Sequence, residues 1–159
     1  MKKLLVTGAA GFIGSNFVHY WHANNPGDRI VALDALTYAG NKNNITDLLG
    51  KDQFSFVKGN ICDKALMESL LVECDIDTLV HLAAESHVDR SIKDSDEFIQ
   101  TNIVGTHTLL TAAKKHWLDG SGNPMHLFHH VSTDEVYGSL SADDAAFTEK
   151  SPYAPNSPY

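Results

Sequence analysis

The chain has 159 residues, of which 43% are hydrophobic and 20% charged, and its formal net charge is -8. This composition is typical of a single globular domain that needs no disulfide or metal to form its core. An acidic balance without a basic run argues against nucleic-acid or anionic-membrane partners, although backbone groups could still hold a small anion. No window approaches about 18 apolar residues, and glycines soon follow the apolar run 4–6, so we expect neither a transmembrane helix nor a signal peptide. Two cysteines without CxxC spacing favour free thiols and a cytoplasmic protein.

Segments typical of strands and of helices alternate along the chain. Short apolar runs predict strands at 3–7, 29–34, 53–58, 77–82 and 125–132. Helical spacing predicts helices at 12–23, 63–73 and 94–117, the second capped by Asp63 and the third by Asp94 or Ser95, with a short helix within 41–49. The alternation predicts an α/β fold with a doubly wound parallel sheet. Beyond Gly138, three prolines and the lack of any period indicate a long irregular loop.

Three glycines lie between the first predicted strand and the first predicted helix. In VTGAAGFIG, we expect Gly8 to form a sharp turn, Gly11 to let backbone approach a pyrophosphate, and Gly14 to let helix and strand pack closely. The free N–H groups of the helix N-terminus would then face phosphates. Asp34, about 20 residues beyond Gly14, predicts a ribose diol as partner and NAD rather than NADP as cofactor. Tight turns alone are the alternative explanation of the glycines.

Two adjacent acids follow the fifth predicted strand, which otherwise reads as buried. In HHVSTDEVYG, Thr133 and Glu135 can share a face, and Asp134 can join them only where the strand has ended. Ligands of open parallel sheets bind beyond the carboxyl ends of the strands, so both acids could reach one substrate as acid and base. A solvated loop is the alternative, with Thr133 a strand-end hydroxyl that bonds backbone.

The spacing GxxGxxG resembles that of extended short-chain dehydrogenases/reductases, as do GNICD at 59–63, HLAAESHVD at 81–89 and the final YAPNSPY. The triplet Thr133-Asp134-Glu135, with LTYAGN at 36–41 and AAESHVDRSI at 83–92, is similar to the corresponding segments of the dTDP-glucose 4,6-dehydratase family. The resemblance covers the whole chain but only about the first half of a typical family member. It implies that residues 1–159 are an incomplete NAD-binding Rossmann domain, without the last strands and the sugar-nucleotide domain.

The resemblance also implies which residues act. Tyr159 would take the O4 proton of dTDP-glucose, Glu135 the C5 proton, and Asp134 would protonate the departing O6, with Thr133 and Ser86 contacting the sugar. The residues that would contact NAD are Gly8, Gly11, Phe12, Ile13, Gly14, Asp34, Ala35, Leu36, Thr37, Asn60, Ile61, Leu82, Ala83, Ala84, Glu85, Thr101 and Tyr159.

Several expectations limit this assignment. Core filling explains Phe12 and Ile13 equally well, and Asn60, where the family usually carries Asp, should weaken the adenine contact. The nine histidines show no metal-ligand spacing, so we expect no metal site. We expect the isolated chain to be inactive, and the homodimer of the family is doubtful for it. Another nucleotide-sugar dehydratase, decarboxylase or epimerase, or a non-catalytic NAD-binding remnant, remains an alternative.

Overall fold

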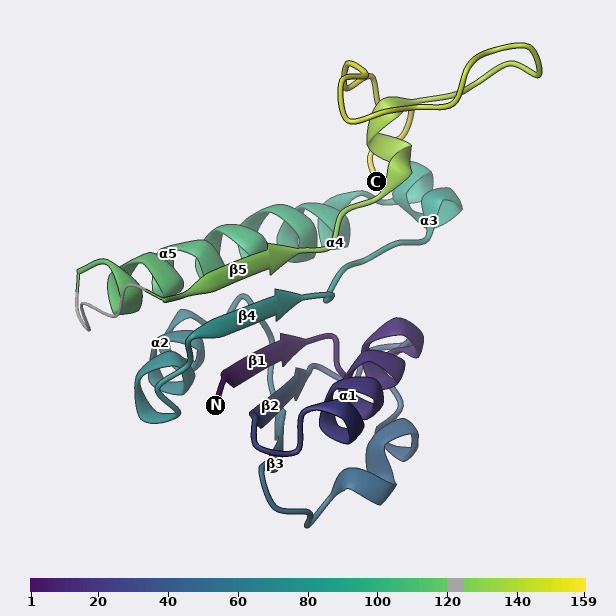
Figure 1. Ribbon diagram of the computed structural model, residues 1–159. Coiled ribbons are helices and arrows are strands. Elements are labelled where there is room, and N and C mark those ends of the chain that lie inside the picture. Colours follow the sequence, from purple (N-terminus) through teal and green to yellow (C-terminus); the bar gives the residue numbers. More distant parts are fainter. Residues whose placement is uncertain (120–124) are drawn as a thin grey trace.

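The computed structural model describes residues 1–119 and 125–159, and its centre is a parallel β-sheet (Figure 1). Within these residues the strands are β1 (Lys3–Thr7), β2 (Arg29–Asp34), β3 (Phe54–Lys58), β4 (Thr78–His81) and β5 (Leu127–His130). Their order is β3-β2-β1-β4-β5, and every pairing is parallel. The predicted α/β fold with a doubly wound sheet is therefore confirmed. Strands β2 and β3 are added on one side of β1, and β4 and β5 on the other side. The point between β1 and β4, where the order of strands reverses, is the place where such sheets bind ligands.

Helices cover both faces of this sheet. One face carries α1 (Phe12–Asn24) and the 3₁₀ helix η1 (Lys42–Leu48), while the other carries α2 (Lys64–Glu73) and α5 (Thr106–Trp117). The Asp63 cap of α2 is confirmed, because its side chain accepts a hydrogen bond of 3.0 Å from the Leu66 backbone N–H. The predicted helix 94–117 is divided into α4 (Asp96–Phe98), a π-helix η2 (Ile99–Gly105) and α5. The sequence did not predict α3 (Val88–Lys93), which precedes them.

The core consists of two apolar layers, one on each face of the sheet. Leu5, Val31, Leu33 and Leu79 point toward α2 and α5, whereas Leu4, Val6, Ile30, Ala32 and Val80 point toward α1 and η1. Because successive side chains of a strand point to opposite faces, continuous apolar runs place buried side chains in both layers. This explains why residues 4–6 of β1 and 30–33 of β2 are all apolar and all buried.

Several apolar side chains are exposed, and the burial expected of the fifth strand was wrong. Ile13 on α1 is 63% exposed, and the apolar positions Ile99, Ile103 and Leu110 of the predicted long helix are about half exposed or more. The fifth strand is also not buried, because β5 forms the edge of the sheet and Leu127 is 49% exposed. The spacing of apolar residues shows which face of a helix or strand is apolar. It does not show whether another element packs against that face.

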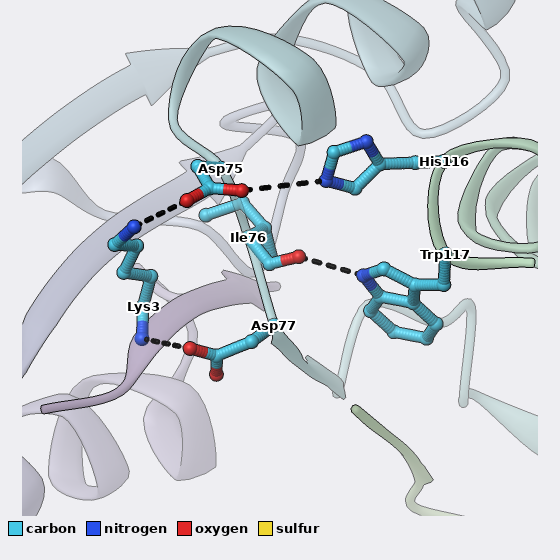
Figure 2. A network of polar contacts seen from close by, with 6 residues as sticks. All are labelled: Lys3, Asp75, Ile76, Asp77, His116 and Trp117. Carbon is cyan, nitrogen blue, oxygen red and sulfur yellow. Dashed lines mark hydrogen bonds and ion pairs between the residues drawn. The ribbon is translucent and has the colours of Figure 1, made fainter. Parts of the chain in front are cut away.

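A polar network joins the amino ends of β1 and β4 to the end of α5 (Figure 2). The Lys3 backbone N–H donates to Asp77 at 3.1 Å, and the Lys3 ammonium pairs with Asp75. The buried Trp117 indole N–H donates to the Ile76 carbonyl at 2.6 Å, so the last turn of α5 is tied to the residues that precede β4. This network lies at the end of the strands opposite to the glycine loop.

The last 21 residues, 139–159, form no helix or strand, as the prolines predicted. The segment returns to its start, because the Ala154 N–H donates to the Val136 carbonyl at 2.9 Å. The ring of Tyr137 contacts those of Phe147 and Tyr153, with centroids 5.2 and 5.6 Å apart. None of the helices in the described ranges is long and apolar enough to cross a membrane.

Candidate functional site: a cleft at the carboxyl ends of the strands

A cleft of about 320 Å³ opens at the carboxyl ends of β1, β2 and β4. Its floor is the glycine loop and the start of α1, and its walls are formed by the segments that leave β2, β3 and β4. Most residues that the sequence assigned to the cofactor line it: Gly8, Gly11, Phe12, Ile13, Gly14, Asp34, Ala35, Thr37, Asn60, Ile61, Leu82, Ala83, Ala84, Glu85 and Thr101. Ser86, expected to contact the sugar, lines it too.

Glycine is required at two positions of the floor by close backbone approach. Gly8 has φ +68°, and a Cβ there would lie 2.8 Å from the Ala83 nitrogen. A Cβ on Gly14 would lie 2.0 Å from the Gly8 carbonyl oxygen. Gly11 is different, because its Cβ would come no closer than 3.4 Å to that oxygen. Gly8 and Gly14 therefore shape the loop itself, while the space above Gly11 belongs to the cleft.

The start of α1 is suited to a phosphate group. Its N-cap, Gly11, makes no side-chain cap, and the first turn carries no acid. The free N–H groups and the positive end of the helix dipole therefore face the cleft, and no acid of the first turn neutralises them. Phe12 and Ile13 are 82% and 63% exposed while lining the cleft, which favours a ligand contact over core filling.

Asp34 is held rigidly at the end of β2. One carboxylate oxygen accepts a hydrogen bond of 2.9 Å from the Ala10 N–H, and the other accepts one of 2.7 Å from the Leu36 N–H. A Cβ on Gly40 would lie 2.4 Å from the same carboxylate. Because a carboxylate has about four lone-pair sites, Asp34 retains acceptor capacity toward the cleft that it lines.

Leu36 and Tyr159 do not line the cleft, although the sequence assigned both to the cofactor. Leu36 has φ +55° and packs against the core layer under α1, so it acts through its N–H to Asp34. Tyr159 is half-buried, and its ring contacts that of Phe98 at 6.3 Å between centroids. Five lining residues were not assigned from the sequence: Leu33, Ala39, Gly40, Gly59 and Glu97.

The two acids lie beyond the strand, on a turn. After β5 ends at His130, the 3₁₀ helix η3 (Asp134–Tyr137) begins, and Thr133 caps it by accepting a hydrogen bond of 3.2 Å from the Glu135 N–H. Asp134 and Glu135 are both exposed and, like Thr133, do not line the cleft. The turn that would free Asp134 from strand alternation is therefore present. The Thr133 hydroxyl bonds backbone, as the alternative reading proposed.

A buried polar chain lies under the β4 side of the cleft. The Thr7 hydroxyl oxygen accepts from the Leu82 and Ala83 N–H groups at 3.2 Å each, so its own hydrogen is available to His81 Nδ1 at 2.8 Å. The Nε2–H of His81 then donates to the Thr106 hydroxyl at 2.9 Å. Burial, reinforced by the neighbouring His130, lowers the pKa of His81 to about 4. The ring is therefore neutral and fixed as one tautomer at neutral pH.

One buried acceptor in the cleft wall has no partner among the described residues. Glu85 is 93% buried, and its Oε2 makes no hydrogen bond there. A buried carboxylate oxygen without a donor is costly, so a ligand or another part of a longer protein is expected to supply the donor. No group of three or more His, Cys, Asp or Glu side chains in the described ranges is placed to hold a metal ion.

Comparison with known proteins gives consistent matches over the whole chain. The family model described as GDP-mannose 4,6 dehydratase matches residues 5–159. A dTDP-glucose 4,6-dehydratase of Xanthomonas campestris pv. campestris (strain B100) is 53% identical over 161 residues, and one of Neisseria meningitidis serogroup B is 49% identical over 161 residues. In both cases all of this chain is covered, together with 45% of the relative.

A solved structure also matches over the whole chain. The dTDP-glucose 4,6-dehydratase of Bacillus anthracis, in complex with NAD, is 44% identical with a TM-score of 0.86, and the match covers 100% of this chain and 46% of that one. The chain therefore spans about half the length of the relatives it matches. The resemblance inferred from the glycine and acid motifs is confirmed.

Proposed function

Since the chain belongs to the GDP-mannose 4,6-dehydratase family, we propose that it is the NAD-binding part of a dTDP-glucose 4,6-dehydratase. The observation that carries this proposal is the cleft, in which a glycine loop, an uncapped helix N-terminus and an anchored carboxylate meet at the reversal point of the sheet. The sugar nucleotide is proposed from the relatives, which are dTDP-glucose 4,6-dehydratases.

The residues of the cleft fit NAD. A pyrophosphate suits the space above Gly11 and the first N–H groups of α1, where no side chain intrudes. Asp34 suits a ribose diol and would repel a 2′-phosphate, which favours NAD over NADP. The Glu85 Oε2, which has no hydrogen-bond partner among the described residues, offers an acceptor on the β4 side of the cleft. When bound, NAD supplies a hydride acceptor for C4 of the sugar and later a hydride donor for C6.

The remaining steps are proton transfers, which we assign to residues of this chain within a longer protein. The C5 hydrogen of a hexose is not acidic until C4 is a ketone, so the tyrosyl oxygen of Tyr159 is proposed to take the O4 proton first. Glu135 would then remove the C5 proton while Asp134 protonates the departing O6, so that water leaves from C5 and C6. Adjacent carboxylates on η3 suit an acid and a base at adjacent carbons. Because both are exposed, a bound sugar can reach them directly.

The proposed compartment is the cytoplasm. Cys62 and Cys74 are both free, and burial, with a smaller contribution from Glu97, raises the pKa of the Cys62 thiol. Two unpaired thiols suit a reducing environment.

The proposal is tested by titrating the chain with NAD and NADP in a calorimeter. NAD should bind at least about tenfold more tightly than NADP, and Asp34→Asn should weaken NAD binding by about 1–3 kcal/mol, the scale of hydrogen bonds to a charged group. Asp77→Asn is the matched control, because Asp77 also accepts a backbone N–H, from Lys3, but at the opposite end of the sheet. Equal affinity of the unmodified chain for NAD and NADP would contradict the proposal.

A further inference from the structure

The turn that follows β2 packs against the Asp34 carboxylate. Asp34 is buried, and its two carboxylate oxygens accept hydrogen bonds from the Ala10 and Leu36 N–H groups. Gly40, which lines the cleft, approaches the oxygen that Leu36 bonds: a Cβ on Gly40 would lie 2.4 Å from Asp34 Oδ1 and 3.3 Å from its Cγ. Real Cβ atoms essentially never come within 3.0 Å of another heavy atom. The carboxylate can therefore occupy this place only because residue 40 has no side chain.

Space, and not backbone conformation, requires glycine at position 40. The φ of Gly40 lies outside the left-handed region, in contrast to that of Gly8 at +68°. The obstruction is also specific, because the atom nearest to the added Cβ is Oδ1 of Asp34, and the Leu36 Cα follows at 3.0 Å. A side chain at position 40 would thus meet the group that we assign to the ribose diol.

A Cβ at this position would displace the carboxylate more readily than the turn. The Gly40 N–H donates to the Thr37 carbonyl at 3.2 Å, and the next N–H, that of Asn41, donates to the Ala10 carbonyl at 3.0 Å. The turn is therefore bonded both within itself and to the glycine loop. The carboxylate, in contrast, moves by rotation about side-chain bonds. Such a rotation would break its hydrogen bond from the Leu36 N–H.

We propose that Gly40 is a positioning residue for cofactor selectivity, because its missing side chain leaves the Asp34 carboxylate in place to distinguish NAD from NADP. This role rests on the proposed NAD site. A carboxylate in this place accepts hydrogen bonds from the ribose diol of NAD and repels the 2′-phosphate of NADP. Its displacement weakens the first interaction and relieves the second, so the two affinities change in opposite directions. General loosening of the cleft would lower both affinities together.

The test is calorimetric titration of Gly40→Ala with NAD and with NADP. NAD affinity should fall about tenfold, the effect of losing one hydrogen bond to a charged group, while NADP affinity stays the same or rises. The ratio of the two affinities should therefore fall at least about tenfold. Gly27→Ala is the matched control, because Gly27 lies in the exposed turn before β2 and its Cβ would meet nothing within 4 Å. It should leave the ratio unchanged. An unchanged ratio in Gly40→Ala would overturn the proposal, even if both affinities fall.

A second measurement keeps the proposal testable if Gly40→Ala does not fold. Gly40→Ala should lower the urea midpoint of the chain, and it should lower that of the Asp34→Ala variant much less, because the carboxylate is then gone and the Leu36 Cα has to yield only slightly. An equal loss in both backgrounds, including failure of both to fold, would overturn the contact between Gly40 and the carboxylate. A wild-type chain that binds no NAD would contradict the proposed function, and the urea midpoints would still decide whether Gly40 makes room for Asp34.

Discussion

In the glycine loop, we expect Gly14 to be needed for folding and Gly11 to be needed for binding NAD. In Gly14→Ala the new Cβ would lie 2.0 Å from the Gly8 carbonyl oxygen and 2.8 Å from its carbon, so backbone must move by more than an ångström. Forcing atoms into a packed site typically costs about 1–3 kcal/mol and sometimes more. We expect a loss of about 3 kcal/mol or more, because the obstruction is backbone rather than a flexible side chain.

Gly11→Ala is the matched control three residues away. Its Cβ would meet the same oxygen at 3.4 Å, an ordinary contact, and φ is -74°, which alanine adopts readily. Alanine is a poorer N-cap than glycine but restricts the unfolded chain, so the net change in stability should stay within about 1 kcal/mol. The methyl group would occupy the space proposed for the pyrophosphate, so NAD affinity should fall although the fold survives.

The measurement is urea unfolding of both variants, followed by the fluorescence of Trp21 and Trp117, with calorimetric titration of NAD on whatever remains folded. The linear extrapolation to zero urea gives the free energy of unfolding of each variant. If Gly14→Ala is as stable as Gly11→Ala, the loop relaxes easily and the steric argument is refuted. If Gly11→Ala binds NAD as tightly as the unmodified chain, the pyrophosphate does not lie above Gly11.

Two further predictions concern His81 and the acid pair. The pKa of His81 is lowered to about 4 in the folded chain, so the unfolded chain binds more protons below about pH 6.5; the resulting loss of stability on acidification should reach about 3 kcal/mol near pH 4. Urea unfolding at pH 7 and pH 4.5 measures this loss of stability. If His81→Gln loses as much stability between the two pH values, the loss comes from other groups. In a protein of the relatives' full length, Asp134→Asn or Glu135→Gln should slow dehydration about 10²–10⁴-fold, with C4 oxidation less affected. Wild-type turnover in both variants would support a solvated loop.

The strands and the floor of the cleft could be predicted because their signals are local. β1 and β2 coincide with the apolar runs 3–7 and 29–34, and Gly8, Gly14 and Asp34 occupy the places that their spacing indicated. Each of these features is marked by one short run or by the spacing of a few residues, although the close approach of Gly8 to Ala83 crosses the sheet. Local sequence therefore carried enough information to place them.

The acid pair and the long helix could be predicted only in part. The sequence showed that Asp134 and Glu135 follow a strand, but β5 proved to be an exposed edge, and the acids lie on a 3₁₀ turn outside the cleft. Apolar spacing indicated a helix at 94–117, yet the same spacing does not distinguish an α-helix from the π-turns of η2. The spacing also does not indicate that Asn102 of η2 bonds the backbone of Glu85, which lies outside this helix.

Close backbone contacts hold the floor of the cleft, whereas side-chain hydrogen bonds hold its β4 wall, so the two should differ in local stability. In the floor, Gly14 packs against Gly8, and Gly8 packs against the backbone of Ala83. The β4 wall is instead bonded through four side chains that lie in four elements, β1, β4, η2 and α5: Thr7, His81, Asn102 and Thr106. A change that loosens η2 and α5 from the sheet should release the wall before the floor, because Asn102 and Thr106 lie in these two helices. Leu109→Ala, which removes a fully buried side chain of α5, should thus accelerate exchange at the Glu85 amide more than at the Ser15 amide, which is bonded to Gly11 within the floor.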